Sequence, residues 1–322
     1  MKWGHSTVCV PWWCVQEESF GQSFASGECY DPSTGHWRAL PSMSRSRSSF
    51  AAASMNGLLY VVGGDQLGRY YMDTDPGHTD TAECYNPSMG QWRALPNMHE
   101  SRSFCAAACE DGLLYVVGGY NDKFNGTSRE PKPLNTVECY NPLTSLWRVL
   151  PNMSVARLAC AAACADGLLY VVGGCSEAEA VASAECYDIS TETWQPLPEM
   201  HVPRGCSAAV CLDGLLYVIG GGYIDISRLD PYGGRALASV EVYNPLTREW
   251  QALPDMSVPR RGCAAACLDG LLYVAGGRSD QLEELASAEC YDPISRQWRS
   301  LPDMSIPRVS CAVAALPTWG TH

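Results

Sequence analysis

Short apolar segments alternate with turn residues along the chain, and no long segment has the spacing of an amphipathic helix. In one copy of this pattern, the small apolar run 157–164 is followed by the hairpin-type turn Asp166-Gly167 and the β-branched run 168–172. Two further strands are expected at 184–187 and 194–198. The pattern therefore predicts four short antiparallel strands per unit.

This unit recurs along the chain. Six times a Tyr is followed seven residues later by a Trp, at Tyr30/Trp37, Tyr85/Trp92, Tyr140/Trp147, Tyr187/Trp194, Tyr243/Trp250 and Tyr291/Trp298. Successive Trp residues are 47 to 56 residues apart. A period near 50 residues indicates units that bury their faces against one another, and four antiparallel strands per unit are typical of a propeller blade.

Two further features keep the same phase. An Arg stands at the head of each innermost strand, at Arg47, Arg102, Arg157, Arg204, Arg260 and Arg308. A Gly-Gly doublet ends the second strand in five copies, at 63–64, 118–119, 173–174, 220–221 and 276–277. With the Tyr and Trp positions, these residues resemble the kelch repeat over residues 28–316. The resemblance implies an all-β fold, a six-bladed kelch β-propeller.

The blade boundaries follow from the repeat. We expect one domain over residues 1–322, with repeats at about 44–98, 99–153, 154–200, 201–256 and 257–304 and a split blade of 1–43 plus 305–322. Segment 308–315 should be the innermost strand of that split blade, which closes the ring. Segment 9–16 has no Gly doublet and contains Pro11, so either its strand is distorted or about the first twenty residues are a vestige.

A Glu precedes each repeat Tyr, at Glu28, Glu83, Glu138, Glu185, Glu241 and Glu289. One Arg and one Glu per blade in constant phase predict structural ion pairs, because the Arg fork holds a carboxylate at two points. The Tyr and Trp sets recur in every blade too. We therefore expect all four sets to be scaffold, since binding sites are normally asymmetric.

The sequence contains seventeen Cys, an odd number. Many occupy repeat positions at which other copies carry Val, Ser or Phe, which indicates packing positions. We expect reduced thiols, no disulfide and no bound metal. No signal peptide is recognisable and no apolar run is long enough for a membrane span, so a cytoplasmic location is expected. With 35 acidic against 22 basic residues, a nucleic-acid partner is not expected.

Binding is expected where the copies differ. The loops 65–81, 120–136 and 222–239 are longer than their counterparts and carry aromatic residues. Solvated insertions are the alternative interpretation. The kelch domains of ubiquitin-ligase substrate adaptors grip peptides just after the doublet and just after the strand-heading Arg. That resemblance implies a protein or peptide partner at Ser48, Asp65, Ser103, Tyr120, Tyr223, Arg261 and Arg278. We expect Tyr120 and Tyr223 to act as apolar anchors and Arg261 with Arg278 as a charged clamp.

The predicted function is therefore non-catalytic protein binding, either for substrate recognition in ubiquitin ligation or for cytoskeletal scaffolding. Leu158, Cys175, Gly205 and Val309 depart from a polar pocket, and no BTB segment precedes the propeller in this sequence. A kelch-type enzyme, either a copper oxidase or epimerase-like, is the alternative. The six His residues do not share strands in a metal-ligand pattern, and neither a phosphate loop nor a Gly-x-Ser-x-Gly motif is present. No cofactor is expected, and the oligomeric state stays open.

Overall fold

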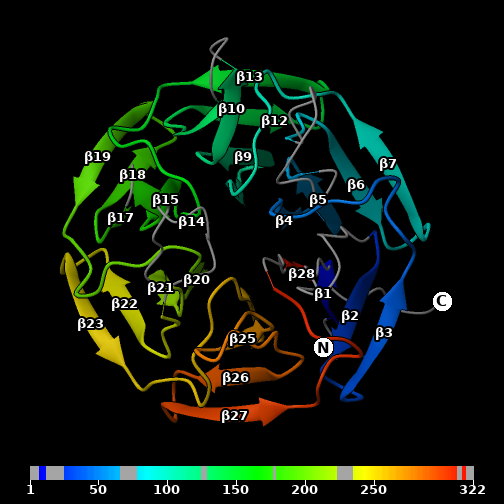
Figure 1. Cartoon of the computed structure of the whole chain (residues 1–322), viewed down its shortest axis with the longest axis vertical. Helices are drawn as coiled ribbons and strands as arrows, with labels where there is room; N and C mark the ends of the chain where they lie inside the picture. Colours follow the sequence, from blue (N-terminus) through cyan, green and yellow to red (C-terminus); the bar gives the residue numbers. More distant parts are fainter. Residues whose placement is uncertain are drawn as a thin grey trace.

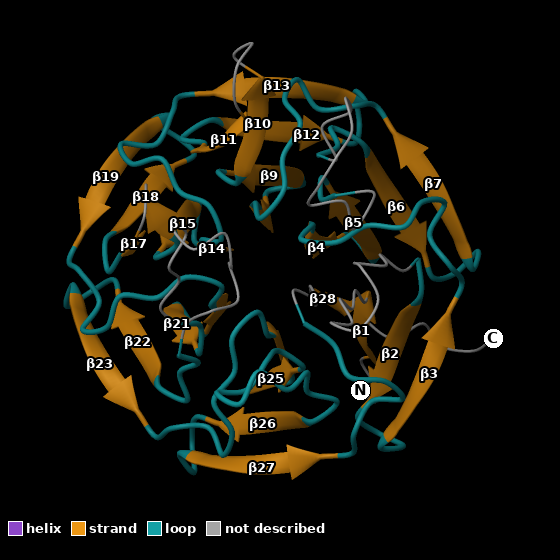
Figure 2. Ribbon diagram, viewed as in Figure 1, coloured by secondary structure: helices purple, strands orange, loops and turns teal. Residues whose placement is uncertain are grey.

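Six four-stranded antiparallel sheets are arranged radially around a central axis in a computed structural model of the chain (Figures 1 and 2). The structure describes residues 7–11, 25–65, 78–124, 129–176, 179–222, 235–309 and 314–316. The predicted all-β, six-bladed propeller is confirmed. In the described residues, no helix is long and apolar enough to cross a membrane.

The strands of each blade are given from the innermost to the outermost. The first blade contains β28 (Ala314–Leu316), β1 (Thr7–Pro11), β2 (Gly27–Asp31) and β3 (His36–Leu40); the second β4 (Ala51–Met55), β5 (Leu58–Val62), β6 (Ala82–Asn86) and β7 (Gln91–Leu95); the third β8 (Ala106–Glu110), β9 (Leu113–Val117), β12 (Val137–Asn141) and β13 (Leu146–Leu150). The fourth contains β14 (Ala161–Ala165), β15 (Leu168–Val172), β18 (Ala184–Asp188) and β19 (Thr193–Leu197); the fifth β20 (Ala208–Leu212), β21 (Leu215–Ile219), β22 (Val240–Asn244) and β23 (Glu249–Leu253); the sixth β24 (Ala264–Leu268), β25 (Leu271–Ala275), β26 (Ala288–Asp292) and β27 (Gln297–Leu301). Two small hairpins, β10 (Tyr120–Phe124) with β11 (Arg129–Pro133) and β16 (Cys175–Ser176) with β17 (Glu179–Ala180), lie outside the blades.

The first blade joins the two ends of the chain, as predicted. Strand β1 pairs with β2 on one side and with β28 on the other, so Val8 lies opposite both Tyr30 and Ala315. The interpretation of this segment as a vestige is therefore wrong for residues 7–11. Pro11 is tolerated because it is the last residue of the strand. The described innermost strand begins at Ala314, and residues 310–313 of the predicted strand lie outside the described residues.

The repeated aromatic residues connect neighbouring blades. In the third blade Tyr140 lies opposite Trp147 in the ladder, and their ring centroids are 5.1 Å apart. The Trp147 indole Nε1–H donates to the Pro96 carbonyl of the preceding blade at 2.8 Å. All six repeat Trp residues make this bond to a Pro carbonyl. Each blade is thus fastened to the one before it by a buried or half-buried indole.

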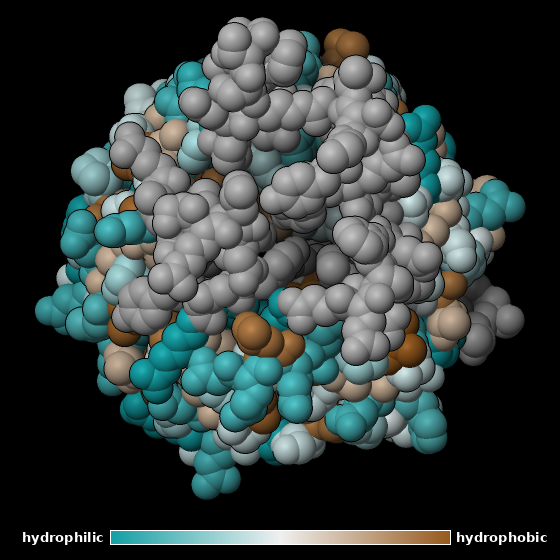
Figure 3. Space-filling model, viewed as in Figure 1, coloured by the Kyte–Doolittle hydropathy of each residue, from teal (hydrophilic) through white to brown (hydrophobic). Residues whose placement is uncertain are grey.

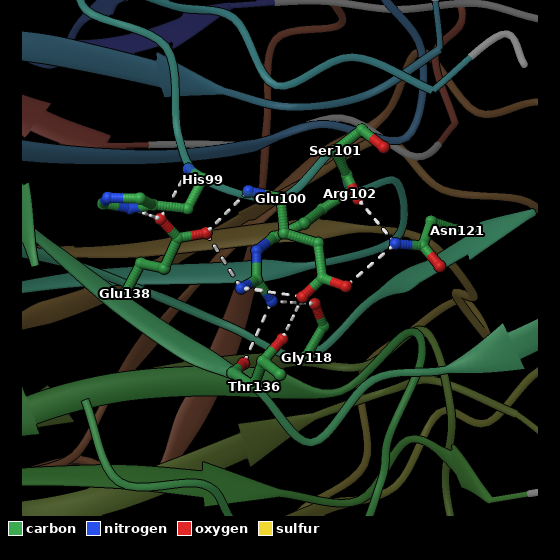
Figure 4. Close-up of polar contacts among 8 residues, drawn as sticks. All are labelled: His99, Glu100, Ser101, Arg102, Gly118, Asn121, Thr136 and Glu138. Atoms are coloured by element: carbon green, nitrogen blue, oxygen red, sulfur yellow. Dashed lines mark hydrogen bonds and ion pairs between the residues drawn. The ribbon is translucent and has the colours of Figure 1, made fainter. Parts of the chain in front are cut away.

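The repeated Arg and Glu form the predicted ion pairs, shown for the third blade in Figure 4. The Arg102 guanidinium donates to the Gly118 and Thr136 carbonyls, both at 3.0 Å, and to Glu138 Oε1 at 3.1 Å. Glu138 Oε2 accepts from the His99 backbone N–H at 2.8 Å. Both charged side chains are almost wholly buried. The network therefore joins the loop that enters the blade to the ends of its second and third strands.

Small side chains fill the narrow space between innermost strands, where adjacent blades converge. Ala51, Ala53 and Ala106 are buried there, together with Cys105 and Cys160. Burial raises the pKa of the Cys105 thiol to about 11 and that of Cys160 to about 12. These thiols are therefore neutral packing groups at physiological pH.

Candidate functional site

The residues after the strand-heading Arg and after the Gly doublet meet at one end of the propeller. Among the described residues they form five isolated antiparallel bridges, Ser48–Asp65, Ser103–Tyr120, Leu158–Cys175, Gly205–Gly222 and Arg261–Arg278. We call this end, which carries the five doublets, the doublet face; the opposite end, which carries the turns after the first and third strands of each blade, is the turn face. The backbone of each bridge is the same, but the side chains differ in every blade.

Glycine is required in the doublet because neighbouring blades approach closely there. Gly63 has φ +68°, and a Cβ on it would lie 2.5 Å from the Arg102 carbonyl oxygen of the next blade. The Gly64 N–H donates to that same carbonyl at 2.7 Å. The doublet thus fixes where the chain leaves the second strand, and with it the position of Asp65 on the face.

A chain of backbone hydrogen bonds runs around the axis at this face. Its members are the residues two positions after the strand-heading Arg, namely Ser49, Phe104, Ala159, Cys206 and Gly262. From Phe104 onward, each N–H donates to the carbonyl of the preceding member at 2.7–2.8 Å, which makes four bonds among the described residues. All five have φ between +50° and +64°, a costly conformation for the four that are not glycine. The chain of bonds holds the bridges of adjacent blades at fixed spacing.

These residues line a small cavity on the axis. It has a volume of about 80 Å³, and its walls include Phe50, Cys105, Cys160, Ser207 and Cys263. Pockets for drug-sized ligands are typically 300–1,000 Å³. Burial raises the pKa of the Cys206 and Cys263 thiols to about 11, which leaves them protonated. The cavity is therefore too small for a drug-sized ligand, and its thiols are not thiolates at neutral pH.

A polar cluster joins the second and third blades on this rim. The His78 imidazole Nδ1 lies 2.5 Å from Asp65 Oδ1 and 2.9 Å from the Ser103 hydroxyl oxygen. The His78 ring also meets the Tyr120 ring edge to face, with centroids 4.6 Å apart. Three predicted site residues thus surround one side chain that the sequence reasoning missed. The only sequence signal was a His inside a variable loop, and its partners could not be inferred without the loop path.

Asp65, His78 and Ser103 are the residue types of a hydrolase triad, but their geometry differs from one. A triad His takes the carboxylate on one ring nitrogen and the nucleophile on the other. Here Asp65 and Ser103 both lie at Nδ1, and the Ser103 side chain is fully buried. The cluster can therefore fix the base of the loop 65–81 on the rim, but it does not present an activated hydroxyl group.

A second set of bonds anchors the hairpin β10–β11 beside this cluster (Figure 4). Glu100 Oε2 accepts from the Thr136 hydroxyl at 2.6 Å, and Glu100 Oε1 accepts from the Asn121 amide at 3.0 Å. Glu100 also lies 3.6 Å from the Arg102 guanidinium. The hairpin is therefore attached to the buried Arg–Glu network, which makes the start of β10, and Tyr120 with it, a fixed part of the rim.

The predicted clamp residues Arg261 and Arg278 lie opposite each other in the sixth blade, but they are covered. Their exposed fractions are 1% and 3%. Arg278 lies 3.9 Å from Glu284, whose backbone pairs with it across the short loop 279–283. Nearby, Asp280 accepts from the Ala236 N–H at 2.9 Å. This sector therefore contains acidic side chains close to its cations, so its charge is partly balanced within the protein.

The remaining predicted residues fall in two groups. Ser48, Asp65 and Tyr120 are half-buried, so each presents part of its surface at the rim. Tyr120 packs against an apolar cluster that includes Phe104, Leu158 and Cys175. The space-filling view of this face has hydrophilic side chains around much of its described periphery, with scattered hydrophobic ones (Figure 3). Tyr223, the second predicted anchor, lies outside the described residues.

Within residues 7–11, 25–65, 78–124, 129–176, 179–222, 235–309 and 314–316, no group of three or more His, Cys, Asp or Glu could hold a metal ion. His99 and His201 bond instead to the scaffold residues Glu138 and Glu241 at 2.8 and 2.7 Å. In this part of the chain these His side chains therefore take part in the ion-pair scaffold.

Comparison with known families and proteins gives consistent matches. A family model described as the KLHDC2/KLHL20/DRC7 Kelch-repeats domain matches residues 49–258, and the Kelch motif matches residues 5–44 and 259–305. The chain is 36% identical over 117 residues to Kelch-like ECH-associated protein 1B of Danio rerio, covering 36% of this chain and 18% of that protein. It is 25% identical over 256 residues to Kelch repeat and BTB domain-containing protein 1 of Camelpox virus, covering 79% and 42%.

Both matches leave most of the relative uncovered: the chain spans less than half the length of these curated relatives. A solved structure described as "Structure of YjhT" superposes with a TM-score of 0.71 and 15% identity, over 88% of this chain and 93% of that one. The sequence matches thus cover the repeat region, and the structural match supports the propeller fold.

Proposed function

The chain belongs to the kelch-repeat family of β-propellers, and from that premise we propose that it is a non-catalytic module that binds a protein segment across the doublet face. One observation carries the proposal. Five bridges have the same backbone geometry and a different pair of side chains in each blade. A rigid frame that presents varied side chains is the usual basis of a recognition surface.

The second and third blades supply the residues of this surface that are best placed to contact a partner. Tyr120 is half-buried, packs on apolar neighbours and is held by His78 and by the anchored hairpin. Tyr is strongly enriched among residues that dominate binding energy, because it offers a large contact area at low entropic cost. Asp65 beside it adds a half-buried hydrogen-bond acceptor. The partner segment would therefore lie over these two blades.

Arg261 and Arg278, unlike Tyr120, are not expected to contact the partner directly. Because both side chains are buried, a partner carboxylate does not reach them in this conformation. They would act through the electrostatic field of the rim and are balanced in part by Glu284. The proposal therefore assigns direct contact to Tyr120 and a supporting role to the Arg pair.

The cellular context of partner binding is proposed from the relatives that this chain resembles. Proteins that carry a BTB domain together with kelch repeats are among those this chain resembles. The resemblance to the kelch domains of ubiquitin-ligase substrate adaptors makes substrate recognition in ubiquitin ligation the proposed context of binding. Cytoskeletal scaffolding is the other context. The two differ in whether the captured partner is ubiquitinated when the propeller is present.

The test uses matched substitutions on the two faces. A partner is captured with the wild-type chain, and its affinity is then measured in purified form against Tyr120→Ala and Leu246→Ser. Leu246 is 95% exposed in a turn on the turn face. Tyr120→Ala should lose at least about 2 kcal/mol, roughly thirtyfold in affinity, whereas Leu246→Ser should not change it. An unchanged affinity for Tyr120→Ala with a loss for Leu246→Ser would move the site to the turn face.

The clamp is tested separately. If Arg261→Ala combined with Arg278→Ala leaves the affinity of a folded variant within about threefold, a direct clamp is wrong. The unfolding midpoint of the double variant is measured in the same series, because these side chains are buried and their loss will also lower stability.

A further inference from the structure

A cleft on the turn face of the second blade is separate from the rim described above. Its volume is about 420 Å³, within the range of small-molecule pockets. It lies where the second strand begins and the turn between the third and fourth strands projects. The residues lining it are Leu58, Cys84, Asn86, Met89, Gln91, Trp92 and Arg93.

The walls of the cleft combine an apolar surface with fixed geometry. Met89 is 65% exposed, so its thioether end is accessible to a ligand in the cleft. Leu58 and Trp92 are half-buried, and the Trp92 indole N–H donates to the Pro41 carbonyl at 2.9 Å. That bond holds the ring in place, so the apolar wall exists before any ligand arrives. The Met89 side chain is unbranched and has several rotatable bonds, so it can adopt different rotamers to fit a ligand.

Arg93 supplies a positive charge to this apolar cleft. In the next blade the equivalent residue, Arg148, donates to Glu192 at 2.7 Å across the blade boundary. The position equivalent to Glu192 is Ser145 in the blade that faces Arg93, so the acidic partner is replaced by a hydroxyl. In the described part of the chain, the Arg93 guanidinium donates to the Cys84 sulfur at 3.9 Å, and no carboxylate is paired with it.

We propose that this cleft binds a small apolar carboxylic acid, whose hydrocarbon part lies against Leu58, Met89 and Trp92 and whose carboxylate pairs with Arg93. Because Arg93 lacks an acidic neighbour, the cleft should favour an anionic ligand, whose carboxylate would take the place that Glu192 has beside Arg148. The apolar wall should favour a ligand with a hydrocarbon group. The site is independent of the doublet face, so this proposal holds or fails separately from partner binding there.

The test is methionine methyl NMR on the full chain, which contains ten Met. The Met89 signal of ¹³C-methyl-labelled protein is assigned with Met89→Leu, and 3-phenylpropanoate is titrated against the uncharged 3-phenylpropanamide. We expect a saturable shift of the Met89 methyl with the acid and a weaker response to the amide. Arg93→Gln should weaken acid binding about fivefold, the upper end for an exposed ion pair.

Arg148→Gln is the matched control, because it removes the equivalent cation in the next blade and should leave the titration unchanged. Three results would overturn the proposal. The Met89 methyl could stay unmoved up to the solubility limit of the acid. The acid and the amide could bind equally, which would remove the role of charge. Arg93→Gln could bind the acid as well as the wild type does, which would assign the response to a different cation.

Discussion

Replacing Arg157 by Met should destabilise the propeller far more than replacing an exposed Arg in a shorter ion pair. Arg157 is 1% exposed and donates to Glu185 at 3.3 Å, to the Gly173 carbonyl at 2.8 Å and to the Ser183 carbonyl at 2.9 Å. Met has a similar length and no charge, so the substitution removes these bonds without opening a large cavity.

The magnitude follows from what the substitution leaves behind. Glu185 stays buried and keeps the bonds from the Ser154 backbone N–H and hydroxyl, at 2.9 and 2.8 Å, but loses its cationic partner. The Ser183 carbonyl keeps a bond from the Gly173 N–H at 3.1 Å, whereas the Gly173 carbonyl loses its Arg157 donor. Removing one partner of a buried ion pair typically costs about 3–5 kcal/mol, since the remaining charge is uncompensated. We expect a loss in this range.

The assay is urea unfolding followed by Trp fluorescence, with Arg148→Met as the control. Arg148 and Glu192 are only 2.7 Å apart, but they are 58% and 48% exposed. An exposed pair contributes about 0–1 kcal/mol, so the control should shift the midpoint little, whereas Arg157→Met should lower it by about 1 M or more. Equal losses for the two variants would refute the reasoning that burial, and not distance, sets the energy of these pairs.

Three other predictions test the scaffold. Deleting residues 305–322 removes Arg308, which pairs with Glu28 at 3.1 Å, and the strand β28, so the melting temperature should fall in one cooperative step; an unchanged melting curve would mean that this strand does not close the ring. Gly118→Ala should cost clearly more free energy of unfolding than Gly112→Ala, because both have positive φ but only the first places a Cβ 2.5 Å from a backbone oxygen; similar losses in denaturant titrations would contradict this. With the pKa of the Cys206 thiol raised to about 11, its alkylation at pH 8 should be about a hundredfold slower than that of a thiol with an ordinary pKa of 9.0, and all seventeen thiols should react after denaturation; rapid labelling of the native chain or a shortfall of thiols would oppose it.

The sequence allowed the fold to be predicted because the repeat signals are local and redundant. The Tyr and Trp of each unit lie opposite each other in the ladder, as Tyr140 and Trp147 do, and their spacing therefore reports the register directly. The Arg and Glu sets were recognisable as scaffold because an ion pair needed in every blade must recur in every blade. The split blade was harder to predict, because β1 lacks the glycine doublet that marks the other second strands.

The candidate site could be predicted only in part. The bridges bring Ser103 beside Tyr120 and Arg261 beside Arg278, a proximity that repeat phase alone implies. The burial of the Arg pair depends on neighbouring segments whose length varies between blades, such as the one that places Glu284 beside Arg278, and no repeat specifies their path. His78 was missed for a related reason, since its contacts join two blades. The cleft at Arg93 could not be predicted from the sequence alone, because it depends on which residue of the next blade lies opposite Arg93, namely Ser145.

The most direct test of the central claim is amide hydrogen exchange of the chain alone and with its purified partner. Binding across the second and third blades of the doublet face predicts slower exchange in segments 46–50, 63–65, 101–104 and 118–121, which contain the bridges of these two blades and the bond between Ser49 and Phe104. Exchange at the turns 110–113, 165–168 and 212–215 on the turn face should not change. Protection confined to those turns or to the outermost strands, with the doublet face unaffected, would contradict the account.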